Sequence, residues 1–409
     1  MRFHYECCDC NKLYYSDEVM YLCPECAKEN NDSSKMRKGN LIVHLNKDDT
    51  DKLLNKKDLS FYDFFPYTVP SVDAFPIGPT PLTTPIRLRE TYGMPNISCK
   101  MDSALPSGSF KDRASQLIIG QAAYHNQDSI ALASTGNAGA AMSCAGAAYG
   151  VKIVLFVPET APVNKLMQSV LYGAEVVPVK GTYDDAFALS IAYTDTFGGI
   201  NRNTAYNPMT VEGKKSVSIE IFIQMGRKVP DVVYVSTGDG CIYAGVVKGF
   251  LDLYQAHLID KVPQVICVQS EKSNAIAKAW ETNEFNNVNS TTIADSISVS
   301  SPANGRMAVR YINETKSWAT QVTDEEILSS QLELAKEAGI FVEPAAACAW
   351  AGFVKDTNTL KEKYGKDVNV CVLLTGVGFK DMAVFTGRVS LPPSIENSVE
   401  AVHKRFNSI

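Results

Sequence analysis

Short, continuous apolar runs alternate with segments of helical character from residue 97 onward. A continuous apolar run of this length is typical of a strand buried on both faces of a sheet. Strands that alternate with helices imply right-handed crossovers and parallel sheets, so the pattern predicts an α/β fold. The predicted strands are residues 130–133, 151–157, 175–179, 232–235, 265–268 and 368–374, and the helical segments that separate them include 184–194 and 216–225.

The first 60 residues depart from this pattern and carry paired cysteines instead. Cys7 and Cys10 are followed, after twelve residues, by Cys23 and Cys26. This is the spacing of a four-thiolate zinc ribbon, and four protein ligands leave no open position, so the metal is predicted to be structural. Cys8 is a spare thiol or an alternative ligand, and a knuckle that keeps its thiols without metal is the alternative. A short strand is expected at residues 41–43.

Two domains follow from this difference. Residues 1–60 are predicted to form the zinc-ribbon-like segment and an arm, and residues 61–409 the main body. An aromatic cluster at residues 61–67 is expected to pack on that body. A chain of 409 residues is long enough to bury a sizeable core in two α/β lobes.

Composition excludes several classes of function. The chain has 39 basic and 45 acidic residues without a basic block, which argues against a nucleic-acid surface. Residues 129–150 are uncharged, but Ser, Thr, Asn and several glycines favour strand, loop and helix over a membrane span. The start of the chain has no apolar signal-peptide region. Scattered cysteines in apolar runs suit a reducing compartment, so a cytoplasmic location is predicted.

A single lysine, Lys111, stands in a distinctive box of residues. The box reads Pro-Ser-Gly-Ser-Phe-Lys-Asp-Arg-Ala-Ser over residues 106–115, and Ser109 is expected to cap a helix that starts near Lys111. The positive end of the helix dipole favours the neutral amine, which is the form that attacks a carbonyl carbon to make a Schiff base. The box alone is equally typical of an exposed lysine in a capped helix.

Three further motifs come downstream in a fixed order. Residues 134–139 (Ser-Thr-Gly-Asn-Ala-Gly) and 237–241 (Thr-Gly-Asp-Gly-Cys) each lie between a predicted strand and a predicted helix, and residues 374–381 (Leu-Thr-Gly-Val-Gly-Phe-Lys-Asp) follow the last strand. A glycine turn at a helix start presents backbone N–H groups to an anion. Each turn taken alone is equally typical of a tight strand-to-helix connection without a ligand.

Together with Lys111, these motifs resemble the fold-type-II enzymes that use pyridoxal 5'-phosphate (PLP), and within them the threonine synthase family. The resemblance covers the chain from about residue 73 to the end of the last strand. It implies two lobes with parallel sheets, the smaller at about residues 110–215, and PLP bound between them. Ribbons like that of residues 1–60 also occur in some members.

The resemblance assigns the cofactor site residue by residue. Lys111 supplies the amine, Asn137 contacts the ring 3-hydroxyl, and Thr375 faces the ring nitrogen. A neutral hydroxyl at that nitrogen suits elimination and replacement chemistry better than transamination. The phosphate cradle comprises Gly238, Asp239, Gly240, Cys241 and Ile242, although many relatives carry glycine or asparagine in place of Cys241 and Ile242.

The resemblance also implies where the substrate binds. Its carboxylate is expected at Ser134, Thr135, Gly136 and Asn137, and its phosphate near Asn207, in a stretch where the family usually carries an arginine and this chain has Thr210. A guanidinium is the natural bidentate partner of phosphate. Lys165 and Lys215 are the predicted substitutes for this arginine, and Lys214 and Arg306 are cations that could take the same role.

The sequence therefore predicts a PLP-dependent lyase that converts O-phosphohomoserine and water to threonine and phosphate. One alternative is a related β-eliminating or β-replacing enzyme, such as a serine or threonine dehydratase or an O-phosphoserine-type synthase. Another is a catalytically silent zinc-ribbon binding protein. The expected partner is a small amino acid, with no nucleic acid and no membrane, and a homodimer stays open.

Overall fold

The structure, a computed structural model, describes residues 1–386 and 388–406. Its largest sheet has six strands, of which five are parallel and one edge strand is antiparallel. In spatial order these are β12 (Ala319–Val322), β11 (Gln264–Ser270), β10 (Val232–Ser236), β13 (Val370–Leu374), β5 (Ile97–Met101) and β4 (Leu82–Thr83).

Both faces of this sheet are covered, which explains the continuous apolar runs. Val233 and Val235 pack into one core, whereas Val232 and Tyr234 pack into the other. Residues of β10 and β13 are all buried. The second core lies under α3 (Ile86–Tyr92), α13 (Asp324–Ala338) and α14 (Pro344–Tyr364); the first lies under α9 (Ser216–Gln224), α10 (Cys241–Gln255), α11 (Ala275–Thr282) and α12 (Gly305–Glu314).

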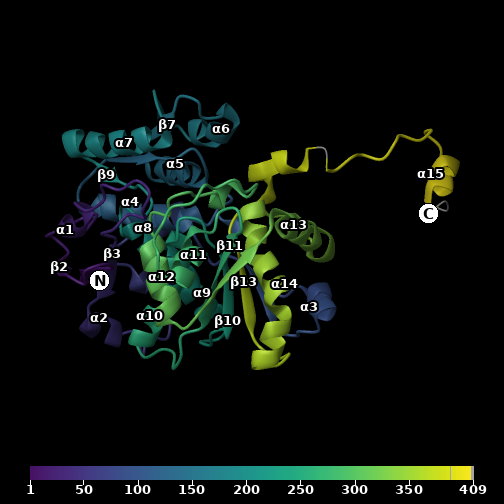
Figure 1. The fold of residues 1–409 in the computed structure, drawn as a ribbon, viewed down its shortest axis with the longest axis horizontal. Coiled ribbons are helices and arrows are strands. Elements are labelled where there is room, and N and C mark those ends of the chain that lie inside the picture. Colours follow the sequence, from purple (N-terminus) through teal and green to yellow (C-terminus); the bar gives the residue numbers. More distant parts are fainter. Residues whose placement is uncertain (387, 407–409) are drawn as a thin grey trace.

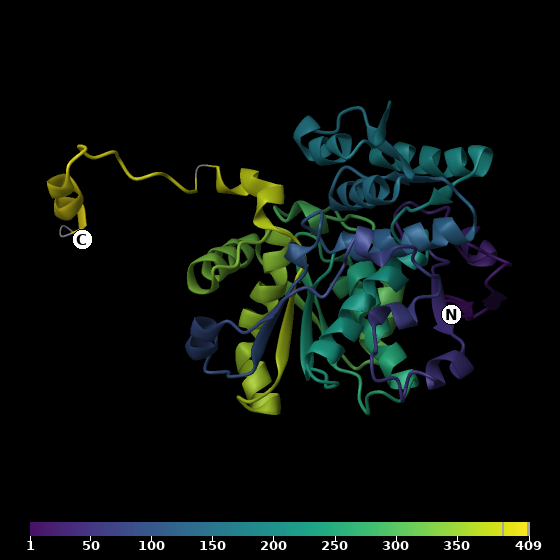
Figure 2. The same ribbon diagram turned by 180° about the vertical axis from the view of Figure 1, so that it is seen from behind.

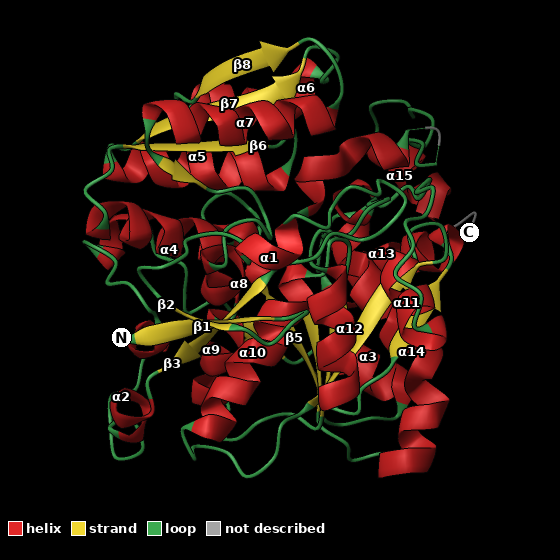
Figure 3. Ribbon diagram, turned by 60° about the vertical axis from the view of Figure 1, so that its left-hand side comes forward, coloured by secondary structure: helices red, strands yellow, loops and turns green. Residues whose placement is uncertain are grey.

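A second, smaller sheet lies above the first in Figure 1 and is seen from another side in Figure 3. Its four strands are all parallel, in the order β8 (Glu175–Val179), β7 (Lys152–Pro158), β6 (Ser129–Ala133) and β9 (Ile200–Asn201). The helices of this part are α4 (Lys111–Tyr124), α5 (Asn137–Tyr149), α6 (Val163–Leu171), α7 (Tyr183–Phe197) and α8 (Met209–Lys214). The predicted α/β fold with parallel sheets is confirmed.

The N-terminal segment forms a three-stranded antiparallel sheet of its own. Its order is β2 (Leu13–Tyr15), β1 (Phe3–Cys7) and β3 (Leu41–Leu45), and the short helices α1 (Pro24–Ala27) and α2 (Lys47–Asp51) follow the strands. It packs directly on the main body: the Asn40 Nδ2 donates to the Ala205 carbonyl at 3.0 Å, and the rings of Tyr21 and Tyr206 stack. The predicted strand at residues 41–43 is confirmed as part of β3.

The C-terminal residues leave the body as an arm. After the 3₁₀ segment Gly378–Phe385, the chain extends away and ends in α15 (Val399–Phe406), as Figures 1 and 2 show from opposite sides. The remaining 3₁₀ segments are Phe61–Phe64, Val72–Ala74, Asp102–Ala104 and Asp295–Ile297. None of the described helices combines the length and the apolar character that a membrane span requires.

Candidate active site

Lys111 is the first residue of α4, where the chain leaves the larger sheet for the smaller one. The turn before it is tied to the end of β13, because the Phe110 N–H donates to the Thr375 carbonyl at 2.8 Å and Ser109 bridges Gly376. The helix therefore starts where predicted: Phe110, the residue before it, already has helical backbone angles. The Ser109 hydroxyl accepts from the Lys111 N–H at 3.4 Å, as expected of a capping side chain.

The surroundings of Lys111 favour the neutral form of its amine. Burial lowers its pKa, an effect that Glu343 and Asp239 oppose and Arg202 reinforces. Within the described residues, Lys111 Nζ donates no hydrogen bond, in contrast with Lys380, whose Nζ donates to Gln168 at 2.7 Å. A buried, unengaged amine is the group that covalent capture of an aldehyde requires.

The turn of residues 238–242 forms a cradle of backbone donors at the start of α10. Gly240 adopts φ +90°, and a Cβ there would lie 2.7 Å from the Asn304 carbonyl oxygen. The Cys241 N–H donates to the Asp239 carboxylate at 2.9 Å. The N–H groups of residues 238, 239, 240 and 242 have no acceptor among the described residues. Four free donors at the positive end of a 15-residue helix fit a phosphate group.

Asn137 opens α5 and is oriented by a carboxylate. Its Nδ2 donates to the Ser296 hydroxyl at 3.0 Å and to both carboxylate oxygens of Glu343 at 3.1 Å. The Ser134 hydroxyl accepts from the N–H groups of Gly136 at 3.3 Å and Gly139 at 3.0 Å, which fixes the turn containing Thr135. The structure thus brings residues 134–137 to the same region as Lys111 through Glu343, which interacts with both.

Glu343 was missed by the sequence analysis. It is buried at the N-cap of α14, its N–H donates to the Gly376 carbonyl at 3.0 Å, and a Cβ on Gly376 would lie 2.3 Å from its Oε1. Gly376 therefore leaves the room that this carboxylate occupies beside Thr375. The available signal was the Glu-Pro pair before an alanine-rich segment, because proline favours the first helical position.

The residues predicted to bind the substrate phosphate have other partners in the structure. Lys165 lies on α6, partly exposed, and pairs with Asp295 at 2.8 Å. Asn207 uses its side chain to hold the backbone, donating to the Asn201 carbonyl at 2.9 Å and to Gln121 at 2.7 Å and accepting from the Met209 N–H at 2.9 Å. Neither side chain contacts the cradle through a hydrogen bond or ion pair among the described residues.

Lys215 and Arg306 are likewise engaged elsewhere. Lys215 is fully buried and pairs with Glu212 at 2.5 Å and Asp252 at 2.7 Å. Arg306 lies over the Phe285 ring at 4.2 Å and approaches Asp9 of the N-terminal segment at 3.6 Å. The Thr210 hydroxyl donates to the Asn207 carbonyl at 2.7 Å and accepts from the Ala205 N–H at 3.1 Å, so it serves the turn before α8.

The N-terminal cysteines converge on one point. The Sγ atoms of Cys7, Cys10, Cys23 and Cys26 all lie within 4.8 Å of one another, with Cys7 to Cys26 at 3.7 Å and Cys10 to Cys23 at 3.8 Å. A tetrahedron with zinc–sulfur bonds of about 2.3 Å has sulfur–sulfur edges of about 3.8 Å, so the four thiols fit zinc. Cys8 lies outside this set and donates to the Asp9 carboxylate at 3.2 Å.

Comparisons with known proteins agree with this geometry. The model of the family described as pyridoxal-phosphate dependent enzyme matches residues 74–376. A threonine synthase of Methanocaldococcus jannaschii is 32% identical over 92% of each chain, and one of Methanosarcina acetivorans is 29% identical over 98% of each. Among solved structures, the processed form of threonine deaminase isoform 2 from Solanum lycopersicum gives a TM-score of 0.66 at 20% identity, covering 78% of this chain and 92% of its own. Maize serine racemase gives 0.66 at 18% identity, covering 80% and 93%. These structures share the two-lobed fold.

Proposed function

Since the chain belongs to the threonine synthase family of pyridoxal-phosphate-dependent lyases, we propose that it converts O-phosphohomoserine and water to threonine and phosphate. The observation that carries the proposal is similarity to threonine synthases over nearly the whole chain, including the N-terminal segment. The cofactor is PLP, and the N–H groups of the 238–242 turn, which have no acceptor among the described residues, fit its phosphate near Lys111. A silent binding protein is not favoured, because the reactive lysine and the cradle are both present.

PLP, when bound, withdraws electrons from the α-carbon of an amino acid and so makes its proton removable. Lys111 Nζ would hold the cofactor through its aldehyde and, when released, would take up the α proton of the substrate and carry protons between carbons. Burial supports this role, because it lowers the pKa of the amine and so favours the neutral form that accepts a proton. The N–H groups of residues 238–242 hold the cofactor phosphate.

The remaining residues orient the ring and the substrate. Glu343 fixes the Asn137 amide through Nδ2, which leaves Oδ1 available to the ring 3-hydroxyl. The Thr375 hydroxyl, which makes no hydrogen bond to the described residues, is assigned to the ring nitrogen. The donors of the 134–137 turn are assigned to the substrate carboxylate, because the start of α5 favours an anion.

A product assay tests the reaction. The PLP-loaded enzyme is expected to release equal amounts of threonine and phosphate from O-phosphohomoserine. O-phosphoserine, serine and threonine are tested in parallel. Turnover of one of these without threonine from O-phosphohomoserine would replace the proposal by the β-eliminating or β-replacing alternative, which Thr210 favours because the hydroxyl is committed to its own turn.

We further propose that Cys7, Cys10, Cys23 and Cys26 bind one structural zinc ion. The tetrahedral sulfur spacing supports it, and the segment is too short to form much core without a metal. Metal analysis is expected to find about one zinc per chain, as one thiolate set implies. Cys23→Ser is expected to lower the stability of the N-terminal sheet and to leave PLP absorbance intact, whereas Cys8→Ser, the matched control, keeps the metal. Recovery of no zinc from protein that folds normally would show that the thiols are vestigial.

Three smaller assignments stay predictions: the domain boundaries at residue 60 and at about residues 110–215, the cytoplasmic location, and a homodimer. The sheet of residues 3–45 and the smaller parallel sheet of residues 129–201 are compatible with these boundaries. Limited proteolysis is expected to cut between lobes before it cuts within them.

A further inference from the structure

Arg202 is a buried cation, and two of its three side-chain nitrogens lack an acceptor among the described residues. It follows β9, and its N–H donates to the Ala131 carbonyl at 2.8 Å, which fixes the backbone beside the smaller sheet. The residue is 1% exposed. Its Nη1 donates to the Thr204 hydroxyl at 2.6 Å, but its Nε and Nη2 are buried without a partner among the described residues. A buried guanidinium without acceptors destabilises the fold unless an anion binds to it.

Lys214 is a second buried cation in the same condition. It ends α8, is 1% exposed, and makes no hydrogen bond or ion pair through its amine within the described part of the chain. Its neighbour shows the usual alternative, because the equally buried Lys215 is paired with Glu212 and Asp252. The two adjacent lysines therefore differ in kind: one is neutralised by the protein and the other is not.

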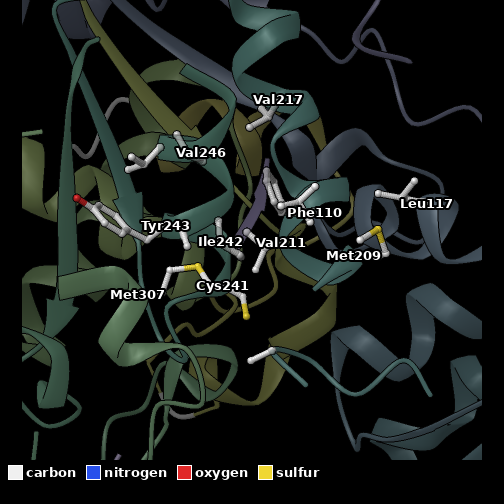
Figure 4. Packing of buried hydrophobic residues seen from close by; sticks show 14 of the residues in the cluster. Phe110, Leu117, Met209, Val211, Val217, Cys241, Ile242, Tyr243, Val246 and Met307 are labelled. Atoms are coloured by element: carbon white, nitrogen blue, oxygen red, sulfur yellow. The ribbon is translucent and has the colours of Figure 1, made fainter. Parts of the chain in front are cut away.

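Both cations lie beside the cradle at the start of α10. A Cβ on Gly245, in the second turn of α10, would lie 2.6 Å from the Lys214 Cβ, so α8 packs closely against this helix. Figure 4 shows Val211 of α8 next to Cys241 and Ile242 at the same helix start. Burial lowers the pKa of Arg202 to about 10 and also lowers that of Lys214, and for both groups Cys241 and Asp239 act in the opposite direction.

Lys111 completes the group. The charge of Lys111 helps to lower the pKa of Lys214, after burial, and the charge of Arg202 helps to lower that of Lys111. Three basic side chains thus face one region, and the acidic groups that act on it are Asp239, Glu343 and Asp112. The ligand of this region carries negative charge, and a dianion with several oxygens matches a guanidinium and an ammonium together.

We propose that Arg202 and Lys214 bind the phosphate group of the substrate, and so replace the arginine that the family carries at the position of Thr210. The inference rests on the proposed function. A phosphate monoester has two sources in this site, the cofactor and the substrate. The four N–H groups of the cradle already suffice for the cofactor phosphate, whereas Thr210, Lys165 and Lys215 are engaged by other residues. Arg202 and Lys214 are therefore available for the phosphate of the substrate.

Inorganic phosphate tests the site directly on the PLP-loaded enzyme. Calorimetric titration is expected to find one phosphate per chain, bound beside the cofactor. Arg202→Gln and Lys214→Gln are each expected to weaken this binding about ten- to a hundredfold, the range typical of a lost hydrogen bond to a charged group. The matched controls Arg87→Gln and Lys261→Gln remove exposed, ion-paired cations and are expected to leave it unchanged.

The affinity for PLP, measured by its absorbance, shows whether Arg202 and Lys214 bind the cofactor phosphate or the substrate phosphate. The proposal expects that PLP affinity stays within about threefold in both variants, a change below 1 kcal/mol. A loss of PLP affinity in a protein whose wild-type loaded form binds no added phosphate would assign the pair to the cofactor and overturn the inference. Unchanged binding of both phosphates would make the pair structural and overturn it as well.

Two further measurements keep the outcomes distinct. If Arg202→Gln fails to fold, Arg202→Lys keeps the charge but not the bidentate geometry, and weaker phosphate binding is expected in a folded protein. Threonine formation from O-phosphohomoserine is followed separately. Phosphate binding at the pair without threonine formation would contradict the proposed reaction alone. Threonine formation with unchanged KM in both Gln variants would contradict this inference alone.

Discussion

Two groups of buried cations lie a few residues apart in this protein and differ in their partners. In one group, Lys215 and Lys248 share Glu212 and Asp252, and in a related network Arg113 lies between Asp102 and Glu220. In the other group Arg202 and Lys214 are buried and Lys111 is half-buried, and none of the three pairs with a carboxylate of the described residues.

The difference separates scaffold from site. A buried pair is neutral and anchors helices to each other; here Arg113 ties α4 to α9 and to the end of β5. An unpaired cation is destabilising until a ligand neutralises it, so its presence indicates where an anion binds. Exposure alone would not distinguish the two groups, because Arg202 and Lys214 are almost fully buried, as are Lys215 and Arg113.

The largest expected effect comes from the unpaired group. Lys111→Ala is expected to lower kcat by at least about a thousandfold, because the variant loses both the amine that binds the cofactor and the proton carrier. Borohydride reduction of the wild-type holoenzyme followed by peptide mapping is expected to label Lys111. A label on Lys214 or Lys380, two other lysines near it, would show that Lys111 is not the lysine that binds the cofactor.

The second prediction sets the two adjacent lysines against each other. Lys215→Met leaves Glu212 and Asp252 with only Lys248, and the free energy of unfolding is expected to fall by about 3–5 kcal/mol. Lys214→Met removes a cation that has no partner, so the cofactor-free variant is expected to be as stable as the wild type or more stable. Denaturant titration measures both. Equal destabilisation by the two substitutions would show that Lys214 has a stabilising partner after all.

The strands illustrate what could be predicted from sequence. Residues such as Val232 to Val235 form continuous apolar runs because both faces of the strand are covered, and this signal is local. Strand β5 was not predicted individually, because Lys100 interrupts its pattern. That lysine is buried and is neutralised by Glu220, a residue 120 positions away in the chain. No local pattern contains such a partner.

The residues of the candidate site also fall into those that a local pattern reveals and those whose role depends on distant partners. Lys111 and the glycine turns were found because each is a local strand-to-helix or turn-to-helix motif. Arg202 and Glu343 were missed, because their significance depends on what lies opposite them. Lys214 and Lys215 could not be distinguished, since Asp252, which pairs with Lys215 and not with Lys214, comes 37 residues after Lys215. The sequence thus identifies residues that can act chemically, but it does not show which of their charges are neutralised by partners in the fold.

A third prediction tests whether the unpaired group faces the cradle. Gly240→Val places a side chain at φ +90°, against the Asn304 carbonyl, and is expected to weaken PLP binding by about 1–3 kcal/mol. Val at Gly339, which also has positive φ but open space around it and lies in the helix end far along the chain, controls for backbone strain. PLP affinity from absorbance titration is the measurement. The comparison would need revision if both variants bound PLP equally.

The smallest expected effect is a change in how stability depends on pH. Burial lowers the pKa of Lys214 below its ordinary value of 10.5, whereas the unfolded chain keeps this lysine protonated up to about that value. Between the two pKa values the unfolded state binds more protons, so this group makes the free energy of unfolding rise with pH and destabilises the fold at lower pH. Lys214→Met removes that contribution. The free energy of unfolding of the cofactor-free proteins, followed from pH 7 to about 10, is therefore expected to rise less, or to fall more steeply, in the variant than in the wild type.

Lys215 is expected to affect the pH dependence in the opposite direction, because Asp252 and Glu212 raise its pKa despite burial. Its stabilising effect is lost only as the pH rises through that raised pKa. Identical pH profiles for the wild type and Lys214→Met would mean that Lys214 is not buried as a lone cation, and the distinction between the two groups would then rest on Arg202 and Lys111.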